Sequence, residues 1–281
     1  MGNITRRLIE LIGLYATLIT FSLFAVLPLL WMITTSFKPT TQIFISPPVL
    51  VPERFNFIID HYLTVLKDSK MLRYFLNSVI ISSLSVIAGV IVGVSAGYGF
   101  ARFRFKGRNW LFIFVIISRM IPRIALIIPL YMLMIRIRLV DTHSGLIIVY
   151  AIISLPMSVW LLTAYFMNLP VELEEAALLD GCTRWQALTK IVLPISLPAV
   201  FAVGMYCFLL AWNEYLLALV FSTSYGVRPI AVGLTDYFLE ALVDWGPLMA
   251  ACVLATIPPM VVFWFGQKHF ISGLVRGAMK G

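Results

Sequence analysis

Charged and hydrogen-bonding side chains occur at two places within otherwise apolar stretches of this sequence. Arg119 and Arg123 lie on either side of Pro122, and they share one face if a helix continues through the proline. Charges at membrane depth usually face water or protein, so both arginines are candidates for lining a solute path. The interpretation we favour is simpler. Pro122 breaks the helix near the membrane interface, and both arginines extend to water.

The second place is the cluster Trp212-Asn213-Glu214, which we expect within the helix of another apolar stretch. Flat apolar surfaces combined with hydrogen-bonding groups suit the C–H faces and hydroxyls of a sugar. The same side chains also suit hydrogen bonds between membrane helices. The residues alone leave these two uses equally open.

Motifs of common catalytic, metal and nucleotide sites do not occur in the sequence. The three cysteines lie far apart and suggest neither a disulfide framework nor a thiolate metal site. The histidines have no metal-ligand spacing, and there is no phosphate-binding loop, His-Glu-x-x-His motif or serine elbow. We therefore expect no enzyme activity, cofactor or metal in this chain.

The elements that position these residues are predicted to cross a membrane. Hydrophobic residues make up 61% of the 281 residues and charged residues only 12%, and one helical span needs about 20 apolar residues. Six runs meet this requirement, at approximately 11–34, 75–100, 110–135, 144–167, 199–222 and 247–266. Their hydrophobicity is continuous rather than alternating, which argues against a β-barrel. We predict an all-α, multi-pass membrane protein with a single transmembrane domain over residues 1–281, its first run retained as an anchor.

Basic residues indicate how this protein is oriented. Arg102, Arg104, Lys106 and Arg108 crowd the short connection between the second and third runs. Short basic connections stay in the cytoplasm, and six spans place both termini on the same side. We therefore expect a protein of the cytoplasmic membrane with both termini in the cytoplasm.

The connection at about 168–198 predicts a helical hairpin on this cytoplasmic side. Pro170 suits the first position of a helix, and Gly181 suits its left-handed end. Thr183 and Gln186 match a capping box that opens a second helix, which Pro194 ends. Acidic residues in the first turn complement the helix dipole.

Apolar side chains on this hairpin need a partner, because Leu178, Leu179 and Trp185 are expected outside the bilayer. The hairpin is either a docking element for another protein or an amphipathic pair that lies on lipid or folds back on its own bundle. Elsewhere, Gly89, Gly93 and Gly97 form a ridge of small residues, for which we favour packing within the chain over a subunit interface.

One stretch of the hairpin resembles the EAA loop of binding-protein-dependent ABC importer permeases. It reads Glu175-Ala176-Ala177, three residues, Gly181, nine residues and Ile191-x-Leu193-Pro194. Further segments resemble the sugar-importer branch, and in particular the shorter, six-span member of the maltose-type permease pair. These segments are Asn77-Ser78 and residues 96–103, 120–122, 128–131, 212–214 and 273–281.

The resemblance implies a type I importer permease that conducts a sugar or related solute. The hairpin then forms the coupling helix in a cleft of a cytoplasmic ATPase. The coupling residues implied are Glu175, Ala176, Ala177, Asp180 and Gly181, with a C-terminal ATPase contact at Gly277, Lys280 and Gly281. The implied partners are a homologous second permease, two ABC ATPase subunits that bind ATP and Mg²⁺, and an extracytoplasmic solute-binding protein.

An ion-driven secondary transporter is the alternative. Such transporters build ion sites from acidic residues or broken helices near mid-membrane, in two repeated halves. Glu214 is the only clear carboxylate in the middle of a predicted span, and the two halves of the sequence show no convincing repeat.

Overall fold

The computed structural model describes residues 2–49, 58–239 and 243–278, and every regular element in these ranges is helical. The helices are α1 (Gly2–Ser36), α2 (Thr40–Ile43), α3 (Asp60–Lys67), α4 (Ser69–Arg102), α5 (Arg108–Ser118), α6 (Arg123–Arg136), α7 (His143–Met167), α8 (Glu172–Leu179), α9 (Arg184–Ala187), a π-helical segment (Leu188–Val192), α10 (Leu193–Ile195), α11 (Leu197–Trp212), α12 (Leu216–Phe221), α13 (Ile230–Gly233), α14 (Asp236–Leu239) and α15 (Trp245–Ala278). The predicted all-α class is confirmed.

The chain forms two compact units. One comprises Met1–Leu72 and Leu234–Thr256, and the other comprises Arg73–Gly233 and Ile257–Gly281. In the first unit, the large apolar side chains of α1 from Ile9 to Leu30 are exposed, as expected of a helix that contacts lipid or another subunit. We call the other, larger unit the second unit.

A buried lysine, Lys38, follows α1 in the first unit and connects several segments of it. The Nζ of Lys38 donates a hydrogen bond to the carbonyl of Val49 and lies 4.5 Å from the ring centroid of Trp31. His61 Nε2 lies 2.9 Å from the carbonyl oxygen of Lys38. A cation removed from water needs such partners, so Lys38 fixes the chain that follows α1.

The core of the second unit is built on α4, α7 and α11. The glycine ridge of α4 packs directly on α7, where the facing residues Ser154, Ser158 and Leu162 also recur every four residues. A Cβ added to Gly93 would lie 2.9 Å from the Cβ of Ser158, and one added to Gly97 would lie 2.9 Å from the Cβ of Leu162. The prediction that the ridge packs within the chain is confirmed.

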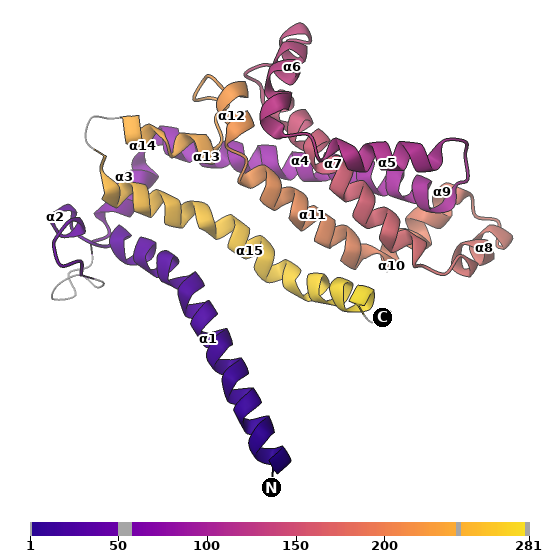
Figure 1. Cartoon of the computed structure of the whole chain (residues 1–281). Helices are drawn as coiled ribbons and strands as arrows, with labels where there is room; N and C mark the ends of the chain where they lie inside the picture. The colour runs from indigo at the N-terminus through magenta and orange to yellow at the C-terminus, as the bar shows by residue number, and fades with distance from the viewer. Residues whose placement is uncertain (1, 50–57, 240–242, 279–281) are drawn as a thin grey trace. The chain divides into compact units, whose positions relative to one another are not determined.

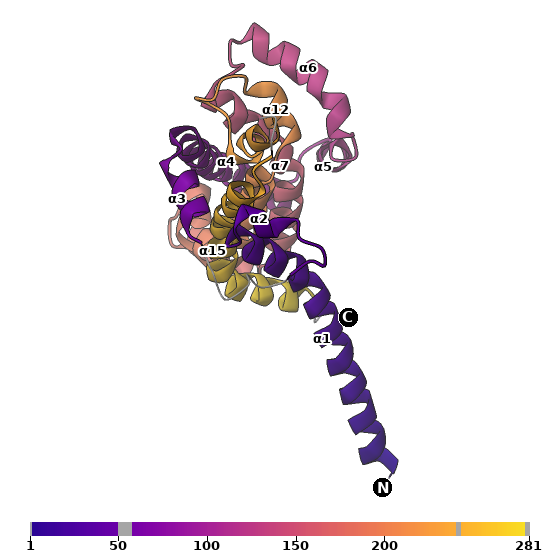
Figure 2. The same cartoon turned by 90° about the vertical axis from the view of Figure 1, so that its left-hand side faces the viewer.

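Among the residues that the structure describes, four helices are long and apolar enough to cross a membrane, and counting two bent pairs as spans raises the total to the predicted six. The third predicted run is one of these pairs. It is α5 followed by α6, with a bend of 102° between them. In Figure 1 and Figure 2, α5 runs beside α7 while α6 turns away from it. Pro122 precedes the first residue of α6, so the predicted break at this proline is confirmed.

The fifth predicted run, 199–222, also differs from a continuous helix. Helix α11 ends at Trp212 and α12 begins at Leu216, so our placement of Asn213 and Glu214 within a helix is wrong, whereas Trp212 is the last residue of α11. A second bend, of 80°, separates α10 from α11 at Ser196. Pro198 lies in the first turn of α11, where a missing N–H is tolerated, and it limits how the preceding helix can continue.

Candidate functional site

The predicted helical hairpin is present at residues 172–195. Gly181 has a φ of +86°, and the N–H groups of Gly181 and Cys182 donate to the carbonyls of Leu178 and Ala177, at 3.1 and 3.0 Å. This pair of bonds is a Schellman motif, which ends α8 as expected. The capping box is also present, because the Thr183 hydroxyl accepts from the N–H of Gln186 and the Gln186 side chain accepts from the N–H of Thr183.

The predicted end of the second helix at Pro194 is wrong. After α9 the chain continues through a π-helical segment into α10, which includes Pro194 and ends at Ile195. A π-helical turn changes the hydrogen-bond pattern just before the proline, which has no N–H to donate. The hairpin therefore stays helical until the bend at Ser196.

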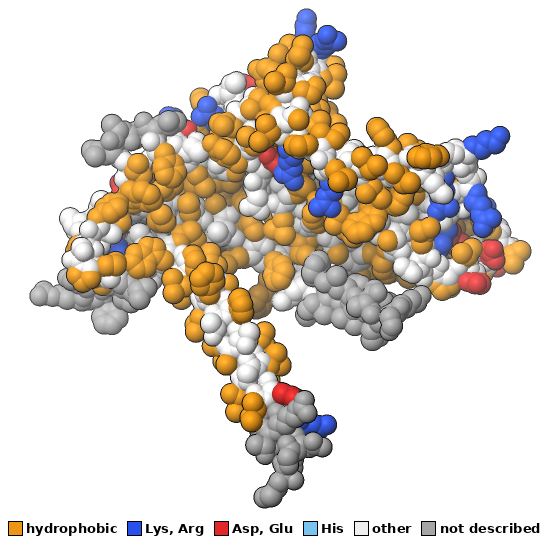
Figure 3. Space-filling view, in the orientation of Figure 1, with side chains coloured by type: hydrophobic (Ala, Val, Ile, Leu, Met, Phe, Trp, Pro, Cys, Tyr) orange, Lys and Arg blue, Asp and Glu red, His pale blue; other side chains and the backbone are white. Residues whose placement is uncertain are grey.

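Most of the residues that the resemblance assigns to coupling lie on the outer surface of α8. Glu175, Ala176, Asp180 and Gly181 are exposed, whereas Ala177 is only 3% exposed and packs inward. Leu179 is 89% exposed at the end of the helix. In Figure 3, acidic side chains lie over α8 and basic side chains over the neighbouring end of the same unit. This arrangement offers a partner a short helix end with a projecting leucine.

Nothing in the local sequence distinguishes Glu174 from the acidic residues beside it. Its side chain is buried and contacts Tyr98 and Arg102 of α4. The available signal was the spacing of Tyr98 and Arg102 on α4, because residues four apart share a helix face. Without the tertiary structure, nothing connects that face to α8.

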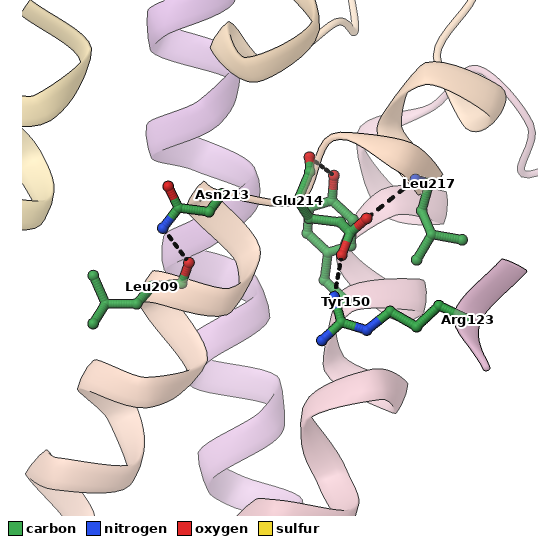
Figure 4. A network of polar contacts seen from close by, with 6 residues as sticks. All are labelled: Arg123, Tyr150, Leu209, Asn213, Glu214 and Leu217. Atoms are coloured by element: carbon green, nitrogen blue, oxygen red, sulfur yellow. Dashed lines mark hydrogen bonds and ion pairs between the residues drawn. The ribbon is translucent and has the colours of Figure 1, made fainter. Parts of the chain in front are cut away.

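The structure brings together two residues that the sequence analysis treated separately. Arg123, the first residue of α6, donates through Nη1 to Oε2 of Glu214 at 2.7 Å (Figure 4). The other carboxylate oxygen of Glu214 accepts from the N–H of Leu217 at 3.2 Å, and the Tyr150 hydroxyl donates to its backbone carbonyl at 3.4 Å. Glu214 is buried while Arg123 is half exposed. The ion pair joins α6 to the break between α11 and α12, and the Tyr150 hydroxyl joins α7 to the same break.

The other predicted path residues are placed differently. Trp212 is buried, stacked on Phe208 and edge-on to Phe75. Asn213 follows the last residue of α11, is exposed, and donates to the carbonyl of Leu209 in that helix (Figure 4). Arg119 is exposed, with Nη1 at 2.7 Å from the sulfur of Met157. Within this chain, Trp212 and Glu214 thus serve packing and interhelical bonding, while Arg119, Arg123 and Asn213 remain accessible.

The predicted C-terminal contact can be placed only in part. Gly277 lies in the last turn of α15, whereas Lys280 and Gly281 lie outside the described residues. In the parts of the chain that the structure describes, no three His, Cys, Asp or Glu side chains gather as metal ligands would. The geometry here is that of an exposed helical hairpin and an interhelical ion pair.

Comparisons with known proteins agree on the family. The family described as binding-protein-dependent transport system inner membrane component matches residues 89–276, which include the hairpin. The chain is 35% identical to the trehalose/maltose transport system permease protein MalG of Thermococcus litoralis, over 99% of each chain. It is 32% identical to the inner membrane ABC transporter permease protein YcjP of Escherichia coli, over 98% of this chain and 99% of that one.

The fold has a counterpart among solved structures. A crystal structure of a bacterial ABC transporter involved in the import of the acidic polysaccharide alginate contains a chain that matches with a TM-score of 0.83. The match covers 94% of this chain and 97% of that chain at 22% identity, so it bears on the fold alone. Sequence and fold agree, and the chain belongs to the family of inner membrane components of binding-protein-dependent transport systems.

Proposed function

We propose that this permease imports a sugar or a closely related solute, and that it forms half of the translocation path beside a homologous second permease. The relative at 35% identity over 99% of both chains is named for trehalose and maltose transport, which supports a sugar as cargo. The short basic connection before α5 supports an orientation with both termini in the cytoplasm. Arg119, Arg123 and Asn213 are the accessible polar residues proposed to line the path.

In this proposal α8 is the coupling helix and docks in a cleft of a cytoplasmic ATPase. The exposure of Leu179 carries the argument, because a leucine that is 89% exposed beside exposed Glu175 and Ala176 suits a protein interface better than water. Gly181, without a side chain, allows the partner close to the turn. The Glu175 carboxylate would pair with a basic group of the partner.

The proposal also includes the remaining partners of the transporter. The sequence has no phosphate-binding loop, so two partner ATPase subunits would bind ATP and Mg²⁺ and supply the energy. An extracytoplasmic solute-binding protein would deliver the cargo to the opposite face. The C-terminal residues Gly277, Lys280 and Gly281 are proposed to contact the ATPase as well.

Co-purification tests the proposal. The tagged chain is purified from gently solubilised native membranes as the parent and as the Glu175→Lys, Gly181→Asp and Asp60→Lys variants. We expect the parent to retain an ATPase and a second permease, and the two hairpin variants to lose the ATPase. Asp60→Lys is the control, because it makes the same kind of charge reversal at an exposed carboxylate on α3. A parent that purifies alone and moves solute with an ion gradient and no ATP would establish the secondary transporter instead.

A further inference from the structure

The first turn of α8 carries three glutamates in two environments. Glu172 and Glu175 are exposed, whereas Glu174 is only 4% exposed. Helical periodicity explains the difference, since Glu174 and Ala177 share the face that packs into the second unit. Helix α8 therefore has an outer face available for docking and an inner face that carries a buried charge.

Both oxygens of the Glu174 carboxylate are held by the end of one helix. Oε1 lies 2.6 Å from Nε of Arg102, and Oε2 accepts a hydrogen bond from the Tyr98 hydroxyl at 2.8 Å. Arg102 is the last residue of α4 and lies one turn after Tyr98. It also donates through Nη2 to the carbonyl of Leu169, at 3.0 Å, on the chain that enters α8. The hairpin is thus attached to α4 at two points, one on α8 and one just before it.

The surroundings make this attachment stiff. The ring of Tyr98 packs edge-on against Phe166 of α7, at 6.1 Å, and against Phe103, at 6.0 Å. The guanidinium of Arg184, on α9, lies 5.4 Å from the centre of the Phe103 ring. Buried charges that satisfy each other's hydrogen bonds separate only at a high free-energy cost. A displacement of α8 is therefore passed to α4 rather than absorbed by side-chain rearrangement.

Above this attachment, α4 is itself locked to its neighbour. Gly97, five residues before Arg102, brings the backbone of α4 against Leu162 and Thr163 of α7. A shift at the end of α4 must then move both helices, because a close-packed glycine contact leaves no room for sliding.

We propose that Tyr98 and Arg102 are positioning residues that, by holding Glu174, transmit the movement of the docked hairpin into α4. This inference rests on the proposed function, because it takes α8 as the docking helix for the ATPase. If the contacts of Tyr98 and Arg102 with Glu174 only stabilised the hairpin, their removal would have a different effect. Loss of these contacts would then lower the amount of assembled transporter, but each assembled complex would still respond normally to nucleotide.

The test follows the movement of α4 in the complete transporter, purified with its native partners. An environment-sensitive fluorophore is attached at Val92→Cys, an exposed position on α4, after the three native cysteines have been replaced. Emission is recorded with and without ATP and vanadate in the parent and in the Glu174→Gln and Tyr98→Phe variants. Tyr165→Phe is the matched control. It also removes one hydroxyl in this unit, but that hydroxyl joins α7 to the carbonyl of Ile195, at the opposite end of the hairpin from α8, and bonds neither Glu174 nor α4.

We expect the nucleotide-driven change in emission at position 92 to be smaller in Glu174→Gln than in the parent by at least about fivefold. Allosteric coupling usually changes an equilibrium by a factor of about five or more. The change in emission should also be smaller in Tyr98→Phe, while Tyr165→Phe matches the parent. ATPase recovery and ATP hydrolysis should stay within about a factor of two, because the docking face of α8 is untouched. If Glu174→Gln does not assemble, Tyr98→Phe decides the matter, since phenylalanine keeps the ring packing.

Two results would overturn the inference. One is an equal response at Val92 in Tyr98→Phe and Tyr165→Phe, and the other is a parent whose α4 does not respond to nucleotide at all. Failure of the proposed function looks different. In that case the ATPase is absent from the parent preparation, or it is retained by Glu175→Lys.

Discussion

Arg123 and Glu214 are 91 residues apart in the sequence, yet the structure joins them in an ion pair of 2.7 Å. The two ends of the pair are unequal, because the side chain of Arg123 is 51% exposed and that of Glu214 only 4%. Each residue sits at a break in the helical structure. Arg123 begins α6 after the bend at Pro122, and Glu214 lies between α11 and α12. The pair therefore connects two breaks in the helices, where some backbone groups have no hydrogen-bond partner within a helix.

This inequality predicts an asymmetric effect of mutation. Arg123→Gln leaves a buried carboxylate without its cation and should lower the free energy of unfolding by about 3 kcal/mol. Glu214→Gln leaves a half-exposed arginine that water can solvate, so its cost should be about 1 kcal/mol. Denaturant titration of the purified protein measures both variants, with Arg119→Gln as control because the side chain of Arg119 contacts the thioether of Met157 rather than a carboxylate. Equal losses in the two variants would contradict the asymmetry.

The ridge of α4 predicts sharply different effects for two glycines of the same helix. Gly93→Ala places a Cβ 2.9 Å from that of Ser158, so α4 and α7 must separate, and we expect a loss of about 1–3 kcal/mol. Gly99→Ala meets nothing within 4 Å and should be neutral or stabilising by up to about 1 kcal/mol, from helix propensity alone. The comparison is made by thermal unfolding in detergent. An equal change in Tm in both variants would show that helix propensity, and not close packing against α7, determines the effect of alanine on α4.

Asp141 predicts a pH dependence of stability in the connection between α6 and α7. Burial by itself raises the pKa of Asp141, but the N–H groups of Ser224 and Thr223, which donate to Oδ1 at 3.0 and 2.9 Å, outweigh it and leave the pKa below its ordinary value. The folded state thus favours the carboxylate. The contribution of the Asp141 carboxylate to the stability of the folded state is fully present above the ordinary pKa of about 4. It is lost as the pH falls through the lowered pKa.

The Asp141→Asn variant tests this prediction, because the amide oxygen of asparagine still accepts both hydrogen bonds but the side chain does not titrate. Hydrogen exchange of the amides of residues 222–226 should rise at acidic pH in the parent beyond the change seen in Asp141→Asn. Asp60→Asn, at an exposed carboxylate, should behave as the parent does. Parallel pH profiles for the parent and Asp141→Asn would remove Asp141 as the cause.

Asn77 predicts how the chain between α12 and α13 is held. Its amide donates to the carbonyls of Gly226 and Arg228 at 3.0 and 2.9 Å, and its Oδ1 lies 2.9 Å from Nε2 of His143, which must therefore carry the proton. Asn77→Asp turns a double donor into a carboxylate that faces two carbonyls, and should destabilise the protein by about 1–3 kcal/mol.

Chymotrypsin gives the readout, because release of this segment exposes the bond between Tyr225 and Gly226. Cleavage there should be faster in Asn77→Asp than in the parent. Asn168→Asp is the control, since Asn168 is exposed and its amide donates only to the carbonyl of Ala164 in α7, the helix that ends just before it. Equal cleavage rates in the two variants would show that the bonds of Asn77 do not hold the segment.

Local chemistry in the sequence determined much of this fold. Long apolar runs predicted membrane helices because lipid leaves the backbone no other way to satisfy its hydrogen bonds. Gly181, Thr183 and Gln186 predicted the turn of the hairpin because a left-handed C-terminus and a capping box depend only on neighbouring residues. Pro122 likewise predicted the break before α6. The family followed from a motif that lies within this hairpin.

Only the tertiary structure decided which polar groups meet. Glu172, Glu174 and Glu175 look alike in the sequence, and burial against α4 separates Glu174 from its neighbours. Arg123 and Glu214 were both singled out, but their pairing depends on how α6 and the end of α11 pack. Short-range patterns specify helices, caps and turns, whereas ion pairs between distant segments depend on helix packing, which no local pattern encodes.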